Sequence, residues 1–286
     1  MVRTVVGKQF KRIVGEALAE DLASGDITTE ALVPSELEGK ASILVRRDGV
    51  LAGIDVAKEV FRQVDPSLHF KALVRDGAKV RKGDVVATVE GKVASILRAE
   101  RTALNFLQHL SGIATETARY VDAVLGTKAI ITDTRKTIPG LRLLEKYAVR
   151  AGGGRNHRLN LGDGVLIKDN HLAALRTSGV GLGEVVKQAR ERAPRAMKVE
   201  VEVESVKQAQ EALSAGADII MLDNMNVKDM RRVVELVQGR ALLEASGGIT
   251  LDNVRSVAEA GVDLISVGAL THSAKALDIS VEVDPG

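Results

Sequence analysis

The chain has 286 residues, of which 45% are hydrophobic and 27% charged, a composition typical of a globular protein with one large domain or two smaller ones. It contains no cysteine, which excludes disulfides and thiolate metal sites, and its 2% of aromatic residues is too few for surfaces that stack single-stranded nucleic acid. No apolar run approaches the ~20 residues that span a bilayer, and the first residues lack the apolar core of a secretory signal, so we expect a cytoplasmic protein without nucleic-acid or membrane partners.

The first part of the chain mixes helical and strand patterns. A long helical stretch contains Gly112, where we expect the helix to break, and we place a domain boundary there. Residues 1–113 are therefore predicted to form an N-terminal α/β sandwich domain. Its predicted helices cover residues 8–21, 54–64 and 98–125, and its predicted strands cover residues 39–50, with a turn at 47–49, and residues 70–74.

Short β segments between glycine turns follow at residues 76–87, and this stretch resembles lipoyl- and biotinyl-carrier domains. A carrier of that kind needs a lysine at an exposed hairpin tip. The following residues, 91–96, do not supply such a tip, so we expect residues 80–93 to be structural and keep a carrier function only as an alternative.

From residue 128 onward, short apolar runs alternate with helical segments, which predicts a parallel sheet. Residues 215–220 (AGADII) recur as residues 260–265 (AGVDLI), a weak internal repeat, and no dinucleotide-binding glycine motif follows a strand. Six strand–helix units are recognisable, and we expect a seventh that has no clear pattern in the sequence. This number favours a closed βα barrel over an open sheet. The predicted strands are 129–132, 165–167, 199–203, 219–222, 242–244 and 264–267, and the predicted helices are 141–151, 182–192, 206–215, 227–237 and 252–260.

Polar side chains follow these strands one after another, at the end where βα barrels place their active sites. Residues 134–168 also carry eight basic and two acidic side chains, a net +6 in a chain of net +2. Guanidinium and ammonium groups among glycines suit a site for small polyanions. The residues at the strand ends are Asp133, Thr134, Arg135, Lys136, Lys168, Glu202, Asp223, Asn224, Ser246, Gly247, Gly248, Ser266 and Gly268.

Three groups within this set have more specific expectations. Ser246-Gly247-Gly248 is expected to open a helix capped by Thr250 or Asp252, where bare backbone N–H groups bind phosphate, and Gly268-Ala269 offers a second such turn. Glu202 and Asp223 are expected to chelate Mg²⁺ or hold ribose hydroxyls. Strand alternation puts Glu200, Glu202 and Glu204 on one face, where they need cationic partners. Among the five histidines, His157 lies in the basic stretch, and the other four are expected to be structural.

Several motifs, in this order along nearly the whole chain, resemble the quinolinate phosphoribosyltransferase family. They are residues 21–28 (DLASGDIT), 100–105 (ERTALN), 133–140 (DTRKTIPG), 153–158 (GGRNHR), 166–171 (LIKDNH) and 244–249 (EASGGI). The resemblance implies conversion of quinolinate and phosphoribosyl pyrophosphate to nicotinate mononucleotide, pyrophosphate and CO₂, with Mg²⁺, in NAD biosynthesis. It also implies an incomplete barrel of about seven strands over residues 114–270, and a final segment, 271–286, that returns to the N-terminal domain.

The resemblance also implies roles for individual residues. Members of this family are dimers or hexamers built from dimers, and Arg101 would reach the neighbouring subunit's quinolinate. Arg135, His157 and Arg158 would bind the quinolinate carboxylates, while Lys136 and Lys168 would lie between quinolinate and pyrophosphate. Glu202 and Asp223 would hold the ribose hydroxyls or, directly or through water, Mg²⁺. The predicted catalytic residues are Lys136, Lys168, Glu202 and Asp223, and Thr134, Ser246, Gly247, Gly248, Ser266 and Gly268 complete the predicted substrate site.

Two other enzyme functions fit parts of the same pattern. Lys168, at the end of a barrel strand, is also the kind of residue that forms a Schiff base in aldolases. A related phosphoribosyltransferase-like protein connected with molybdate transport is the nearer alternative. The cation-rich strand ends favour the transferase, because both of its substrates carry several negative charges.

Overall fold

The computed structural model describes residues 2–176 and 179–284, and its chain divides into two compact units. The first unit comprises Met1–Ala118, Thr137–Gly153 and Leu270–Gly286, and the second comprises Arg119–Lys136 and Gly154–Ala269. The sequence-based division at residues 113 and 270 cuts the chain at other points. In particular, it did not separate residues 137–153 from the barrel segment, because a helical pattern does not say which core the helix packs on.

The first unit contains a four-stranded antiparallel sheet in the order β12-β1-β5-β3. The C-terminal strand β12 pairs along the whole of β1, so the end of the chain completes this sheet. The carrier-like stretch 76–87 contains β4 and the first residues of β5, and β5 lies between β1 and β3 as an internal strand of the sheet. The predicted strand over 39–50 is in fact two strands. The bounds are β1 Glu38–Val45, β2 Gly49–Val50, β3 His69–Ala72, β4 Lys79–Val80, β5 Val85–Lys92 and β12 Ile279–Asp284, with β2 paired to β4.

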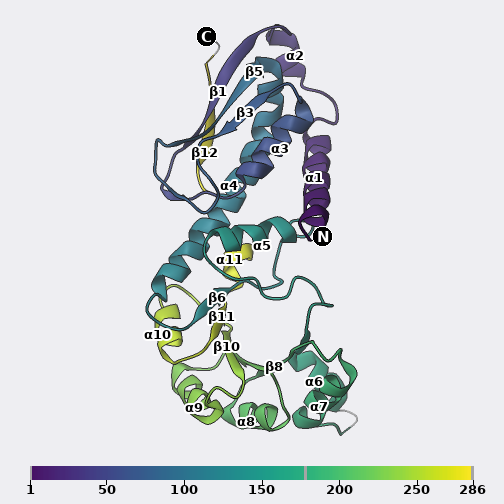
Figure 1. Cartoon of the computed structure of the whole chain (residues 1–286), viewed down its shortest axis with the longest axis vertical. Helices are drawn as coiled ribbons and strands as arrows, with labels where there is room; N and C mark the ends of the chain where they lie inside the picture. Colours follow the sequence, from purple (N-terminus) through teal and green to yellow (C-terminus); the bar gives the residue numbers. More distant parts are fainter. Residues whose placement is uncertain (1, 177–178, 285–286) are drawn as a thin grey trace. The chain divides into compact units, whose positions relative to one another are not determined.

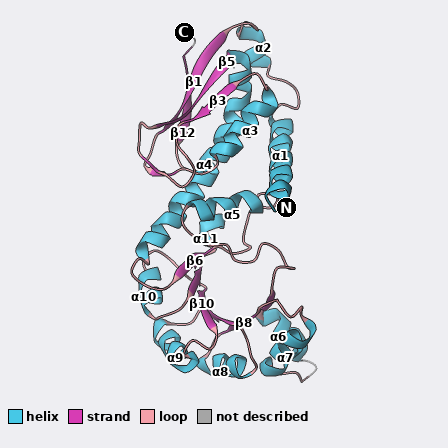
Figure 2. Ribbon diagram, in the orientation of Figure 1, coloured by secondary structure: helices cyan, strands magenta, loops and turns pink. Residues whose placement is uncertain are grey.

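Helices α1 Val2–Asp21, α2 Ile27–Leu32, α3 Ile54–Val64 and α5 Arg142–Ala151 also belong to this unit, and α4 spans Val93–Ala123 (Figure 2). Helix α3 is amphipathic and buries Phe61, whose ring centroid lies 5.7 Å from that of Phe70 on β3. The carboxylate of Asp76 accepts hydrogen bonds of 3.0 Å from the backbone N–H groups of Gly53 and Ile54 at the start of α3, and the Tyr147 hydroxyl also donates to it. These contacts satisfy N–H groups that a helix start leaves without intrahelical partners.

The expected break at Gly112 was wrong, because α4 continues through it. A Cβ atom at this position would overlap the carbonyl oxygen of Lys275 and lie 3.0 Å from the Cα of Ala276. Gly112 therefore permits close packing of the C-terminal segment on the helix, at the small cost of one glycine in a helix interior.

The second unit is an incomplete α/β barrel, with six parallel strands in the order β6-β11-β10-β9-β8-β7 (Figure 1). Arg155 forms a single parallel bridge to Thr132 on the free side of β6, in the place of a seventh strand. The six strands predicted from apolar runs are all present. Their bounds are β6 Ile130–Thr132, β7 Val165–Ile167, β8 Val199–Val203, β9 Ile219–Asp223, β10 Leu242–Ser246 and β11 Leu264–Ser266.

Helices α7 Leu182–Arg192, α8 Val206–Ser214, α9 Val227–Val237 and α10 Val254–Glu259 lie outside the strands, and α6 Asp169–Arg176 and α11 Ala269–His272 are shorter helices at strand ends (Figure 1). The expected N-cap at Thr250 or Asp252 was wrong, because α10 begins only after Asn253. The Asn253 side chain instead accepts from the Thr250 N–H at 2.9 Å and donates to the Gly248 carbonyl at 2.8 Å. Gly247 and Gly248 therefore lie in a loop that is held by hydrogen bonds to the Asn253 side chain, not at the start of the helix. In the described part of the chain, no helix is both long and apolar enough to cross a membrane.

Candidate active site

A cavity of about 600 Å³ opens at the C-terminal ends of the barrel strands. It gathers twelve of the fourteen residues predicted to bind substrate; the other two, Arg101 and Gly268, are not in its lining. Arg101 is exposed on α4 in the first unit, and Gly268 follows β11. The twelve are Thr134, Arg135, Lys136, His157, Arg158, Lys168, Glu202, Asp223, Ser246, Gly247, Gly248 and Ser266.

Arginine and lysine side chains from three separate segments therefore meet in one cavity, as the sequence-based hypothesis required. Arg158 donates from Nη1 to the Gly164 carbonyl at 3.1 Å, and its Nε is buried without an acceptor among the described residues. Burial, followed by the nearby Arg135 guanidinium, lowers the pKa of Arg158 from its ordinary value. Cations held close together in this way gain stability when an anion binds between them.

Asp133 holds the basic loop in place instead of facing the cavity. Its side chain is fully buried, and its carboxylate accepts the His157 backbone N–H at 2.9 Å and a hydrogen bond from the Asn156 side chain. The Arg155 N–H donates to the Ile131 carbonyl at 2.9 Å, which ties the same loop to β6. Asp133, expected among the reactive residues, is thus a positioning residue for His157 and Arg158.

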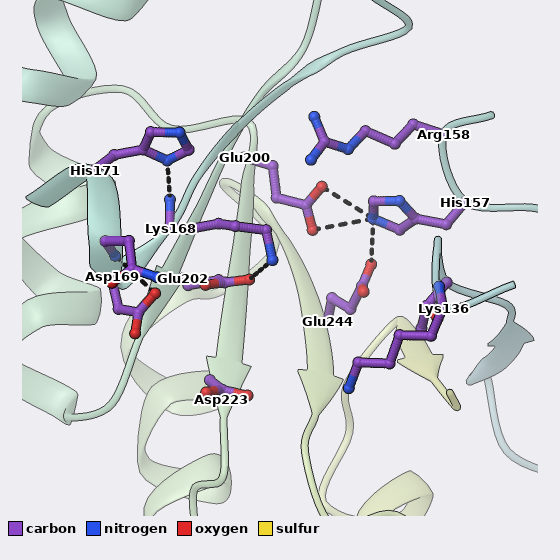
Figure 3. A network of polar contacts seen from close by, with 12 residues as sticks. Lys136, His157, Arg158, Lys168, Asp169, His171, Glu200, Glu202, Asp223 and Glu244 are labelled. Atoms are coloured by element: carbon purple, nitrogen blue, oxygen red, sulfur yellow. Dashed lines mark hydrogen bonds and ion pairs between the residues drawn. The ribbon is translucent and has the colours of Figure 1, made fainter. Parts of the chain in front are cut away.

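The ammonium group of Lys168, just after β7, lies 3.2 Å from Oε1 of Glu202 on β8 (Figure 3). Asp223 ends β9, and its carboxylate accepts from the side chain of Asn224 at 3.3 Å. Glu202 and Asp223 both line the cavity, and their carboxylate oxygens are of the kind that Mg²⁺ prefers as ligands. Glu204 was expected to share one strand face with Glu200 and Glu202. This was wrong, because β8 ends at Val203 and Glu204 is exposed.

Beside these residues lies a cluster of His157, Glu200 and Glu244, in which both glutamates are buried (Figure 3). The Nε2 atom of His157 lies 3.1 and 3.4 Å from the two Glu200 oxygens and 3.6 Å from Oε2 of Glu244. Burial, and then the neighbouring Glu200, raises the pKa of Glu244 to about 7. One ligand atom from each residue lies within 4.8 Å of the others, close enough for the three to hold a metal ion together.

The sequence-based hypothesis assigned no role to Glu200 or Glu244. The signal was present in two places. The alternation of glutamates on β8 implied a face that needs cationic partners, and Glu244 opens the EASGGI motif. Neither signal tells that the side chains of β8 and β10 meet across β9.

The loop after β10 contains two consecutive glycines, which carry no side chain to cover their own backbone N–H groups. Gly247 and Gly248 have φ angles of +84° and +60°, a region that other residues rarely adopt. A Cβ on Gly247 would overlap the Asn224 side chain, and the backbone N–H of Asn224 donates to the Ser246 carbonyl at 2.9 Å. The loop is therefore packed against the end of β9, and it lines the cavity where a phosphate can approach backbone N–H groups.

An α/β barrel with a cation-lined cavity at the C-terminal strand ends defines a protein that binds small anionic molecules there. Two family models match nearly the whole chain: Quinolinate phosphoribosyl transferase, N-terminal domain, over residues 26–111, and the C-terminal domain over residues 113–282. The chain belongs to the quinolinate phosphoribosyltransferase family.

Similar proteins carry matching names. The chain is 46% identical over 276 residues to the nicotinate-nucleotide pyrophosphorylase [carboxylating] of Mycobacterium leprae, covering 94% of this chain and 95% of that protein. It is 43% identical over 275 residues to the probable nicotinate-nucleotide pyrophosphorylase [carboxylating] of Bacillus subtilis (strain 168), covering 96% and 93%. The crystal structure of NadC from Streptococcus pyogenes has a TM-score of 0.91 at 44% identity, covering 96% of each chain.

Proposed function

We propose that this protein converts quinolinate and phosphoribosyl pyrophosphate to nicotinate mononucleotide, pyrophosphate and CO₂. The observation that carries the proposal is the meeting of Arg135, Arg158 and Lys168 in one cavity with the carboxylates of Glu202 and Asp223. The names of relatives at 43–46% identity over at least 94% of the chain supply the reaction.

Quinolinate brings two carboxylates, and the basic side of the cavity offers matching donors. Arg135, His157 and Arg158 bind these carboxylates, because planar guanidinium groups form paired hydrogen bonds to a carboxylate. Arg158, whose Nε has no acceptor among the described residues, gains one when the substrate enters. Fixing both carboxylates orients the ring nitrogen toward the sugar, which lowers the entropic part of the barrier.

The phosphoribosyl group occupies the opposite side of the cavity. The N–H groups of Gly247 and Gly248, with Ser246, Ser266 and the nearby turn at Gly268, bind the 5′-phosphate, and Thr134 lies at the edge of the basic side. Lys136 and Lys168 contact the pyrophosphate. Glu202 and Asp223 would hold Mg²⁺, which when bound offsets the charge of the departing pyrophosphate.

The reaction then follows from the charges. The quinolinate nitrogen forms a bond to the anomeric carbon while the bond from that carbon to pyrophosphate breaks, so positive charge develops on the ribose and negative charge on the leaving group. The carboxylates of Glu202 and Asp223 stabilise the positive charge on the ribose. The ammonium groups of Lys136 and Lys168 stabilise the negative charge on the pyrophosphate. The ring nitrogen becomes cationic, and its charge stabilises the electron pair that departing CO₂ leaves on the adjacent ring carbon; this pair then forms a bond to a proton.

We further propose a cytoplasmic homodimer, or a hexamer built from dimers, in which Arg101 of one subunit contacts the quinolinate of the next. Arg101 is exposed on α4, as a residue that reaches another subunit has to be. The role is supported by the ERTALN motif that the chain shares with its family.

The Schiff-base alternative is weaker, because Lys168 is held in an ion pair with Glu202, whereas a Schiff-base lysine has to react as an uncharged amine. The molybdate-related alternative is not favoured by relatives that are named pyrophosphorylases.

The direct test incubates the protein with quinolinate carrying a labelled carboxyl group, phosphoribosyl pyrophosphate and Mg²⁺, and follows CO₂ and pyrophosphate. Equal amounts of both products, dependent on both substrates, are expected. Absence of CO₂ from a folded protein would refute the proposal, and borohydride trapping of an aldehyde on Lys168 would support the aldolase.

A further inference from the structure

The chain leaves the barrel sheet after β9 through a residue in the left-handed conformation. Asn224 directly follows β9, has a φ angle of +52° and belongs to the lining of the substrate cavity. Asparagine adopts this conformation more readily than most residues other than glycine. The Asn224 backbone N–H still donates to the Ser246 carbonyl at 2.9 Å, one position beyond the ladder that pairs Asp223 with Ser246. The turn therefore keeps the end of β9 joined to β10 while the chain changes direction.

The carboxamide of Asn224 contacts both Asp223 and Gly247. Its Nδ2 donates to Oδ2 of Asp223 at 3.3 Å, and this assignment of the amide follows because a carboxylate only accepts hydrogen bonds. A Cβ atom on Gly247 would lie 2.5 Å from Cγ and 2.8 Å from Nδ2 of Asn224, so the carboxamide occupies the space where another residue would have its side chain. One side chain thus touches the last residue of β9 and the first glycine after β10.

The loop with Gly247 and Gly248 needs support of this kind. Both glycines have positive φ angles, and glycine has more conformational freedom to lose than any other residue. On one side, the Asn253 side chain holds the loop by donating to the Gly248 carbonyl at 2.8 Å. Asn224 packs on the loop from the end of β9. A loop that is already ordered binds a phosphate without the entropic cost of ordering, so these contacts should raise the affinity for a phosphate there.

We propose that Asn224 is a positioning residue that fixes the loop of Gly247 and Gly248 relative to the Asp223 carboxylate, and thereby sets the affinity for a 5-phosphorylated pentose. Such a sugar carries its hydroxyls and its phosphate on one small ring, so it binds well only where the two protein groups are held at a constant separation. The proposal rests on the proposed function for the places of the ribose and the 5′-phosphate. Binding of a free sugar phosphate, however, requires no turnover.

Two replacements separate the side chain of Asn224 from its backbone turn. Asn224→Gly keeps the left-handed turn but removes the carboxamide. The KM for phosphoribosyl pyrophosphate should rise about tenfold, the size expected for the loss of one hydrogen bond and of an ordered loop, while the KM for quinolinate stays within about twofold of wild type. Asn224→Asp keeps the shape but puts a second carboxylate in place of the donor beside Asp223, so its KM for phosphoribosyl pyrophosphate should rise at least as much.

The matched control is Asn226, two residues later, whose side chain caps α9 by accepting from the Asp229 N–H at 2.9 Å. Asn226→Ala should lower the melting temperature through the loss of this cap but leave both KM values unchanged. The control therefore separates a general loss of stability from a loss of sugar-phosphate affinity.

Calorimetry with ribose 5-phosphate, in the absence of quinolinate and metal ions, tests the role of Asn224 independently of turnover. The Kd should be about tenfold weaker in Asn224→Gly and Asn224→Asp than in wild type and Asn226→Ala. This pattern in a protein that is inactive on quinolinate would refute the proposed function and support the role of Asn224. An active protein whose Asn224 variants bind ribose 5-phosphate like wild type would refute the role of Asn224 alone.

Three results would overturn this role. The first is a wild-type protein that does not bind ribose 5-phosphate at millimolar concentration, which needs no variant to fold. The second is an Asn224→Gly protein that is folded by circular dichroism but binds both substrates like wild type, or loses affinity for both equally. The third is a loss of ribose 5-phosphate affinity in Asn226→Ala as large as in Asn224→Gly. Asn224→Asp, which keeps the size of the side chain, replaces Asn224→Gly in these comparisons if the glycine variant does not fold.

Discussion

The Nζ atom of Lys168 lies 3.2 Å from Oε1 of Glu202, so a cation and an anion from neighbouring strands already face each other in the cavity. The side chain of Lys168 is 44% exposed and that of Glu202 is 15% exposed, so the lysine can turn toward an incoming polyanion while the carboxylate stays in place. This arrangement suits a transfer reaction in which negative charge leaves with pyrophosphate and positive charge appears on the ribose.

Replacement of Lys168 by alanine should therefore lower kcat by about 100-fold or more, since a preplaced cation that acts on the leaving group is worth roughly two to three orders of magnitude. Steady-state release of pyrophosphate measures the effect. Lys207→Ala, on the outer helix α8, is the control and should retain wild-type kcat. A Lys168→Ala protein with normal kcat would remove this lysine from the mechanism.

Arg135→Ala should abolish turnover while the fold remains intact. Arg135 lines the cavity beside Arg158, and its charge is among the causes that lower the pKa of Arg158. Without Arg135, the quinolinate carboxylates lose a bidentate donor, so quinolinate binding measured by calorimetry should weaken by at least about tenfold. The melting temperature should fall little, because removing Arg135 relieves repulsion between two close cations. Activity like that of wild type in this variant would contradict the proposed substrate site.

Glu244 should make the stability of the protein depend on pH near neutrality. Its pKa in the folded protein is about 7, above the ordinary glutamate value of 4.5, mainly because of burial. The folded state thus binds this proton more tightly than the unfolded state. Its stabilising contribution is complete below the unfolded pKa and is lost as the pH rises through the folded pKa.

Urea denaturation of wild type should therefore show decreasing stability between about pH 5 and pH 8, and Glu244→Gln should flatten that decrease because an amide does not titrate. A decrease of the same slope in both proteins would place the titrating group elsewhere.

Gly112→Ala should strongly destabilise the first unit. The added Cβ would overlap the backbone at Lys275 and Ala276, and backbone cannot rotate away as a flexible side chain can. Overpacking of this kind typically costs about 1–3 kcal/mol, which exceeds the gain from replacing a helix glycine by alanine. Gly7→Ala in α1 is the matched control, because its Cβ would meet nothing within 4 Å. Thermal unfolding should show a lower midpoint for Gly112→Ala and an unchanged or higher one for Gly7→Ala.

The sequence was sufficient for the six barrel strands and for most of the cavity lining. Buried parallel strands appear as short apolar runs, and a barrel brings residues that follow such runs to one end, so Lys168, Asp223 and Ser246 could be placed together without coordinates. The basic stretch 134–168 indicated Arg158 and His157, and the family motifs added their expected roles.

The remaining features depend on contacts between distant segments. Glu200 and Glu244 meet across β9, and the alternation along a strand gives the face of a residue but not its partner two strands away. Gly112 had the usual pattern of a helix breaker, because the segment that packs on it lies more than 160 positions later in the chain. Asp133 looked reactive because a strand-end carboxylate has the same local pattern whether it faces substrate or holds a loop.

Complementation between two inactive variants should test the predicted sharing of sites between subunits. If Arg101 contacts the neighbouring subunit's quinolinate, a mixture of Arg101→Ala and Lys168→Ala chains contains mixed dimers in which one site has both residues intact and the other has neither. Random exchange makes half of the dimers mixed, so after unfolding and refolding an equal mixture should recover about a quarter of wild-type activity. The Arg101→Ala/Lys168→Ala double variant refolded with Lys168→Ala is the control and should recover nothing, because in that mixture the barrel lysine is absent from every chain. No recovery in the first mixture, although size-exclusion chromatography shows dimers, would mean that Arg101 acts within its own chain or not at all.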